Sequence, residues 1–134
     1  MNIVVDSSVI ISVIANGTEK VNIISRTMGF NLVAPSSVHW EIGNAFSAML
    51  KRKRITQKQA IKAIQIYKSI PIRFVEINLE EALEIADQLQ IYAYEAYLIQ
   101  CALSYQLPLM TLDKNLEFNA KQKGVRLVEV NYHA

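Results

Sequence analysis

The chain begins with Met1-Asn2-Ile3-Val4-Val5-Asp6-Ser7-Ser8-Val9. Three consecutive β-branched residues, Ile3 to Val5, predict a short strand that is buried on both faces of a sheet. The strand is expected to end at Asp6, and Ser7 and Ser8 are expected to cap an apolar helix over Val9–Ala15. Ligands of open parallel sheets bind beyond the carboxyl ends of the strands, which is where Asp6 would lie.

The rest of the chain alternates between short apolar runs and amphipathic segments. Strands are expected over residues 31–34, 72–77, 107–112 and 125–130, and helices over 19–28, 57–69, 79–89, 93–106 and 115–123. A further long helix is expected to be capped by Ser36-Ser37 and to end in Lys51-Arg52-Lys53-Arg54. Thr56 and Gln59 have the spacing of a capping box at the start of one helix. The alternation predicts an α/β fold with a central parallel sheet flanked by helices. With no linker or repeat, the sequence predicts a single domain over residues 1–134.

Composition limits the classes of function. Fourteen Lys and Arg against twelve Asp and Glu permit a nucleic-acid substrate without arguing for one. An apolar fraction of 51% favours an exposed apolar patch, and hence an oligomer or a partner protein. No apolar run approaches the roughly 18 residues of a membrane span. The single cysteine, Cys101, excludes an internal disulfide, fits a reducing cytoplasm, and is expected to be a small buried hydrophobe.

Four carboxylates occupy positions that the sequence pattern predicts to be shielded from solvent. Asp6 and Asp113 each end an apolar strand, so both are expected at the same edge of a parallel sheet, although each could simply cap the helix that follows. Glu95 is placed by helical periodicity on the buried face with Leu98, Ile99, Ala102 and Leu103, opposite Tyr97, Gln100 and Ser104. Glu41 is similarly surrounded by Val38, Ala45 and Ala48, with Asn44 one turn on.

A buried carboxylate is costly unless it is paired or bound to a metal. No basic residue occurs between Arg73 and Lys114, so an ion pair for Glu95 would need a distant partner. Four acids without local bases favour a hard divalent cation such as Mg²⁺ or Mn²⁺. Zinc is disfavoured because His39 and His133 stand in no zinc spacing with Cys101. Carboxylate clusters on such cations are suited to phosphodiester hydrolysis.

Four motifs, in order along the chain, resemble those of PIN domains: Val5-Asp6-Ser7-Ser8-Val9, Trp40-Glu41-Ile42-Gly43-Asn44-Ala45, Tyr94-Glu95-Ala96-Tyr97 with Ala102, and Thr111-Leu112-Asp113-Lys114. More narrowly, they resemble the VapC-type toxins of prokaryotic toxin–antitoxin pairs. The resemblance spans nearly the whole chain.

The resemblance implies a PIN-like three-layer sandwich and a Mg²⁺- or Mn²⁺-dependent endoribonuclease that leaves 5′-phosphate and 3′-hydroxyl ends. It also implies a homodimer that a VapB-like antitoxin inhibits. The catalytic and metal-binding positions it implies are Asp6, Glu41, Glu95 and Asp113, supported by Ser7, Asn44 and Thr111. The third acid of the family is usually Asp, and the longer Glu95 would carry its carboxylate roughly 1.5 Å further.

Two other enzyme or signalling classes fit the same residues poorly. A haloacid-dehalogenase-like phosphatase would have a second Asp two residues after Asp6, where this chain has Ser8, and a receiver domain would have an acidic pair. The stronger rival is a PIN-fold RNA-binding or interaction module with little or no catalysis. The run Lys51-Arg52-Lys53-Arg54 could contact RNA phosphates or could be a solvated helix end that favours the dipole.

Overall fold

The computed structural model describes residues 1–130 and has four strands and seven helices within that range. The strands are β1 (Asn2–Val5), β2 (Asn31–Pro35), β3 (Ile72–Val75) and β4 (Leu109–Met110). The helices are α1 (Ser7–Ile14), α2 (Lys20–Thr27), α3 (Ser37–Lys51), α4 (Gln57–Ser69), α5 (Leu79–Leu89), α6 (Ala93–Tyr105) and α7 (Lys114–Gln122). None of these helices has the length and apolar character that would let it cross a bilayer.

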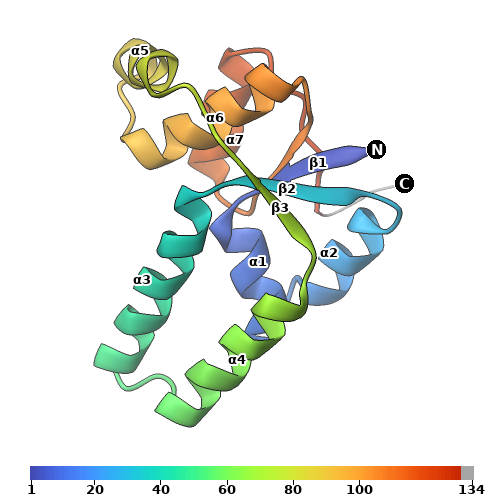
Figure 1. Cartoon of the computed structure of the whole chain (residues 1–134), viewed down its shortest axis with the longest axis vertical. Helices are drawn as coiled ribbons and strands as arrows, with labels where there is room; N and C mark the ends of the chain where they lie inside the picture. Colours follow the sequence, from blue (N-terminus) through green and yellow to red (C-terminus); the bar gives the residue numbers. More distant parts are fainter. Residues whose placement is uncertain (131–134) are drawn as a thin grey trace.

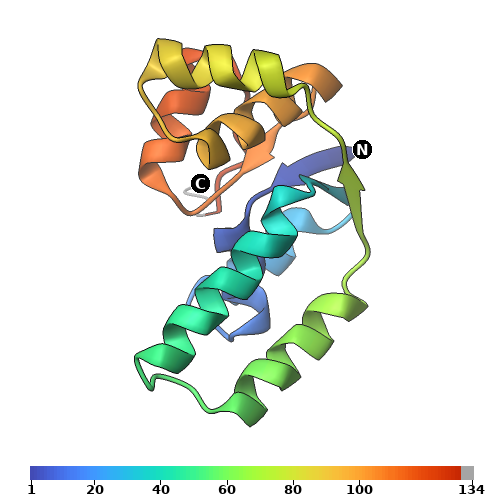
Figure 2. The same ribbon diagram turned by 60° about the vertical axis from the view of Figure 1, so that its left-hand side comes forward.

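The four strands form one parallel sheet in the order β3-β2-β1-β4, which confirms the predicted α/β fold. Helices α5, α6 and α7 lie over one face, and α1 and α2 lie over the other (Figures 1 and 2). Helices α3 and α4 form an antiparallel hairpin that extends away from the sheet to one end of the molecule (Figure 2). The sheet therefore lies between two helical layers, with the hairpin as an arm.

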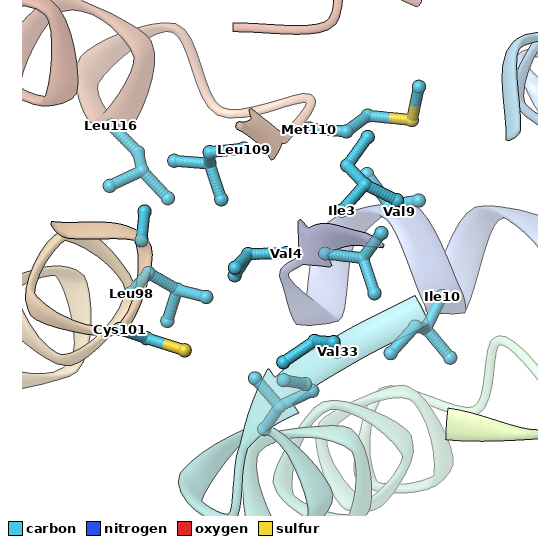
Figure 3. Packing of buried hydrophobic residues seen from close by; sticks show 14 of the residues in the cluster. Ile3, Val4, Val9, Ile10, Val33, Leu98, Cys101, Leu109, Met110 and Leu116 are labelled. Carbon is cyan, nitrogen blue, oxygen red and sulfur yellow. The ribbon is translucent and has the colours of Figure 1, made fainter. Parts of the chain in front are cut away.

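The first strand is the centre of the core, as its β-branched sequence predicted. Ile3, Val4 and Val5 are completely buried, and alternation along the strand sends their side chains to opposite faces. Figure 3 shows Val4 on the side of Leu98 and Leu109, whereas Ile3 lies beside Val9. Because β1 is paired on both edges and covered on both faces, Asp6 at its end is held by rigid surroundings.

Three of the expected strands are shorter than predicted or do not form. The run over 72–77 forms a strand only at Ile72–Val75. The run over 107–112 forms a strand only at Leu109–Met110. The run over 125–130 does not form a strand, and contributes a single parallel bridge between Leu127 and Leu109. The backbone N–H of Leu109 donates to the Arg126 carbonyl, and Val128 N–H donates to the Leu109 carbonyl, so this segment still closes the sheet edge.

The first helix begins earlier than expected. It starts at Ser7, and its N-cap is Asp6, whose side chain accepts from the backbone N–H of Val9. Ser7 and Ser8 therefore lie inside the helix and do not cap it. The predicted capping box of Thr56 and Gln59 is present, and Asn78 caps α5.

Helix α6 differs most from its prediction. Gln100, expected on the outer face, is 1% exposed, whereas Leu103, expected in the core, is 37% exposed. The Gln100 side chain accepts from the Asn78 backbone N–H at 3.1 Å and donates to Glu81 at 3.0 Å. Since α6 packs between the sheet and α5, both of its sides are covered, and periodicity alone could not identify the buried face.

Candidate active site

Asp6 is the buried centre of the candidate site. Its side chain is 6% exposed and accepts three hydrogen bonds: Oδ1 from the Ser8 hydroxyl at 2.6 Å and the Val9 N–H at 3.2 Å, and Oδ2 from the Thr111 hydroxyl. Burial raises the pKa of Asp6, the hydrogen bonds oppose that rise, and the negative charge of Asp113 adds to it. Three hydrogen bonds therefore fix the orientation of the Asp6 carboxylate, and no positive charge among the described residues lowers its pKa.

Asp113 lies beside Asp6 because β4 is the parallel neighbour of β1. It is the N-cap of α7, and its Oδ1 accepts from the backbone N–H groups of Asn115 at 2.9 Å and Leu116 at 3.2 Å. Its side chain is exposed, and no hydrogen bond to its second oxygen is present among the described residues. Both strand-end acids therefore cap helices and also face the same edge of the sheet.

Glu41 approaches Asp6 from α3. Burial and the negative charge of Asp6 raise the pKa of Glu41 to about 7, and its interaction with Ser7 partly offsets that rise. One of its oxygens, Oε2, is buried and has no hydrogen-bond partner among residues 1–130. A buried carboxylate oxygen without a donor is available to a cation or to a water molecule.

Glu95 reaches the same edge from α6 but is only partly buried, in contrast to the expectation of a fully buried side chain. Its Oε1 accepts from the Asn115 side chain at 3.3 Å. Asn115 also supplies one of the backbone N–H groups that hold Asp113, so a single residue connects the two acids. Asn44 is exposed one turn beyond Glu41, and its side chain forms no hydrogen bond within the described range.

Ser8 and Asn115 connect parts of the site, and the sequence did not identify either of them as a site residue. Ser8 donates to Asp6, accepts from the Leu112 N–H at 3.0 Å and lies 3.5 Å from the Thr111 hydroxyl. Thr111 Oγ1 also accepts from the Asp113 N–H at 3.0 Å. Ser8 could have been noticed from its position two residues after Asp6, but Asn115 carries no signal of its link to Glu95.

Among residues 1–130, no positive side chain forms an ion pair with these acids. The single ion pair in residues 1–130 joins Lys114 to Glu117 at 3.1 Å. In the same range, no three Asp, Glu, His or Cys side chains are close enough to share one ion as they stand. The donors are nevertheless all oxygen, and an unpartnered Glu41 oxygen lies beside the buried Asp6 carboxylate, which fits a hard divalent cation.

The cysteine and the described histidine are not part of the acidic site. Cys101 is buried, as expected, and burial raises the pKa of its thiol to about 12. His39 Nδ1 lies 2.9 Å from the Tyr67 hydroxyl, away from the acids. His133 lies outside the described residues.

Several solved structures have a similar fold. The protein PAE2754 from Pyrobaculum aerophilum is 21% identical, covers 97% of this chain and 92% of its own, and superposes with a TM-score of 0.70. VapBC2 from Rickettsia felis, solved bound to a DNA fragment from its promoter, is 12% identical at a TM-score of 0.67, with 96% and 98% covered.

VapC20 from Mycobacterium tuberculosis, a toxin that cleaves the sarcin–ricin loop, is 13% identical at a TM-score of 0.63, with 87% and 93% covered. At these identities the similarity shows a common fold. No curated protein sequence matched the chain. The PIN domain family, in contrast, matches residues 3–122, which is most of the chain and includes all four acids. The chain therefore belongs to the PIN domain family, as the four sequence motifs predicted.

Proposed function

We propose that this protein is a divalent-metal-dependent endoribonuclease and the toxin of a toxin–antitoxin pair. The observation that carries the proposal is the buried Asp6 carboxylate beside the unpartnered oxygen of Glu41, neither of which forms an ion pair with a basic side chain in the described part of the chain. Charges that are expensive to bury are retained where chemistry needs them. Membership of the PIN family and the similarity to VapC20 support the same conclusion.

Mg²⁺ or Mn²⁺ would be held by Asp6, Glu41, Asp113 and Glu95. When bound, the cation supplies Lewis acidity toward the phosphodiester and lowers the pKa of a water molecule. Ser8 and Thr111 fix the orientation of Asp6, and Asn115 connects Glu95 to the cap of α7. Because the acids do not form a close cluster in the structure described, side-chain rotation toward the ion is expected on binding.

The partners proposed for this chain are an RNA substrate, a VapB-like antitoxin and a second copy of the chain. The fold shared with VapBC2 supports the antitoxin. Exposed apolar side chains support a protein interface, and they include Val21 (76% exposed) on α2 and Met28 (75%) directly after it. A cytoplasmic location is consistent with the single reduced cysteine.

The test is cleavage of a mixed RNA pool by purified protein with Mg²⁺, with Mn²⁺ and with EDTA. Asp6→Asn should abolish cleavage and leave the fold intact, because Asn is also an effective N-cap and can keep the bond to Val9. The matched control is Asp87→Asn on α5, where the side chain is exposed, and it should cleave normally. Cleavage retained in Asp6→Asn would contradict the mechanism, and no cleavage by the folded wild type in either metal would favour the binding-module alternative.

A further inference from the structure

Charge is strongly segregated along the chain. Residues 42–75 contain eight of the fourteen Lys and Arg residues and none of the twelve Asp and Glu residues. That segment carries a formal charge of +8, and the remainder, with six basic and twelve acidic residues, carries −6. The small net charge of +2 therefore conceals one strongly basic and one acidic part of the molecule.

The basic part is the α3–α4 hairpin and the strand that follows it. We call the six cations at and near its tip the basic tip: Lys51, Arg52, Lys53, Arg54, Lys58 and Lys62. All six are exposed, and none forms an ion pair or a side-chain hydrogen bond with any residue in 1–130. Their charges are consequently available to a partner.

The tip has a fixed shape. After α3 ends, the N–H of Lys53 donates to the Leu50 carbonyl at 3.0 Å and the N–H of Arg54 donates to the Met49 carbonyl at 2.9 Å. This is the bond pattern of a Schellman motif, with Lys53 at φ +56 in the left-handed position. The capping box of Thr56 then starts α4 at once, so the cations are presented by a closed turn between two stable helix ends.

Helix stabilisation accounts for only some of these cations. Lys51 lies in the last turn of α3, where the helix dipole favours positive charge. Lys58 and Lys62, however, lie in the first two turns of α4, where the helix dipole disfavours positive charge. Mutual repulsion of six cations without intervening acids adds to that cost. Because the clustered positive charges repel one another in the free protein, we expect an anionic ligand to bind there and neutralise them.

The arm connects this cluster to the candidate active site. Glu41 lies near the start of α3 and Lys51 at its end, so the tip is about 15 Å from the site along the helix axis. Figure 2 shows α3 leaving the sheet edge and carrying the tip to the far end of the molecule. A ligand that occupies both regions must therefore be an extended polyanion.

We propose that the basic tip binds backbone phosphates of the RNA substrate at a distance from the scissile bond, and so holds the RNA across the arm. The inference rests on the proposed ribonuclease function. It assigns to α3 two roles at its two ends, since Glu41 lies in the candidate active site and the tip binds substrate. Such contacts are independent of base sequence and depend strongly on salt.

The experiment measures binding in EDTA, so that no cleavage is needed. The probe is fluorescein-labelled oligouridine of about 20 nucleotides, long enough to cover a binding site of typical size, titrated at several salt concentrations. The tip variant combines Lys51→Gln, Arg52→Gln, Lys53→Asn and Arg54→Gln, with Asn chosen because it tolerates the left-handed backbone of residue 53. The control variant removes the same charge elsewhere: Lys20→Gln, Lys121→Gln, Lys123→Gln and Arg126→Gln.

The tip variant should bind at least about tenfold more weakly at low salt, and its plot of log K against log salt should be less steep by about 0.7 for each lost phosphate contact, up to roughly 3. The control variant should retain most of the wild-type affinity and slope. Equal losses in the two variants, or none in the tip variant with both proteins folded by circular dichroism, would overturn the proposal.

A poly-glutamate peptide is the competing probe. If the tip variant loses affinity for the peptide but not for RNA, the tip binds an acidic protein segment and the proposal fails. Because binding is measured without metal, the outcome separates the two proposals. If the tip variant binds RNA more weakly but the wild-type protein cleaves no RNA, the proposed ribonuclease function is overturned. The tip then remains as an RNA-binding surface.

Discussion

Glu41→Gln should stabilise the metal-free protein at high pH. The pKa of Glu41 is raised from 4.5 to about 7, mainly by burial and then by the charge of Asp6. The folded chain therefore holds this proton more tightly than the unfolded chain does, so the free energy of unfolding falls as pH rises from 4.5 to about 7. The penalty is complete above that range and absent below it, and a glutamine removes it.

The size of the effect follows from that difference in pKa. Full burial would correspond to roughly 3 kcal/mol, at about 1.4 kcal/mol for each pKa unit. Because Glu41 is only partly buried, solvent screening should reduce the penalty to about 1–2 kcal/mol. For a chain of this length, the midpoint of thermal unfolding should rise by about 3–8 °C.

The assay is thermal unfolding followed by circular dichroism in EDTA at pH 8 and at pH 4.5. Glu41→Gln should unfold at a higher temperature than wild type at pH 8 and at the same temperature at pH 4.5. Glu84→Gln is the matched control, because it makes the same substitution at an exposed position on α5. Added Mg²⁺ should then raise the midpoint of wild type more than that of Glu41→Gln.

Two results would refute this reasoning. A midpoint at pH 8 that is unchanged or lower in Glu41→Gln would show that the Glu41 carboxylate has a partner or solvent access that the structure does not show. An equal gain at both pH values would show that the substitution acts through packing, because the charge of Glu41 is largely absent from the folded chain at pH 4.5.

Three further predictions concern residues that hold the site and the core. Thr111→Val should cost about 1–3 kcal/mol in urea unfolding because Asp6 loses a buried donor, with Thr18→Val as the exposed control, and an unchanged midpoint would contradict the hydrogen bond. Gln100→Ala should lower the free energy of unfolding by about 1–3 kcal/mol and speed hydrogen exchange in α5, because Gln100 bonds to Asn78 and Glu81. Gln65→Ala on the surface of α4 should do neither, and equal exchange rates in the two variants would contradict the link between α6 and α5. Cys101 should react with a thiol reagent only after unfolding, because burial raises its pKa to about 12, and fast labelling of the folded protein would contradict this.

The sequence predicted the sheet and most helices because those signals are local. The β-branched run at Ile3–Val5 and the capping box at Thr56 each depend on a few neighbouring residues, and both are present in the structure. The segment 125–130 does not form a strand, because a strand needs a neighbouring strand to pair with and this segment forms a bridge to β4 only at Leu109. Gln100 was misplaced for a similar reason, since α5 covers the side of α6 that periodicity assigned to solvent.

The candidate site was predictable in part. Strand-end acids mark one edge of a parallel sheet, so Asp6 and Asp113 could be placed together from order and spacing alone. The hydrogen bonds that Ser8 and Asn115 form across the site depend on side-chain directions that arise only when α1, β4, α6 and α7 are packed. The role of the four acids in metal binding remains a prediction.

Helix capping and metal binding, which the sequence presented as alternatives for Asp6 and Asp113, are compatible in this fold. A carboxylate has two oxygens, and in Asp113 a single one, Oδ1, accepts both N–H groups of α7. In Asp6 the cap bond to Val9 uses Oδ1, while Oδ2 faces Thr111 at the neighbouring strand. The cap fixes the carboxylate at the sheet edge and leaves an oxygen directed away from its own helix. An acid at this position therefore gains its orientation from the helix it caps, and variants that keep the cap, such as Asp6→Asn, separate that role from the chemistry.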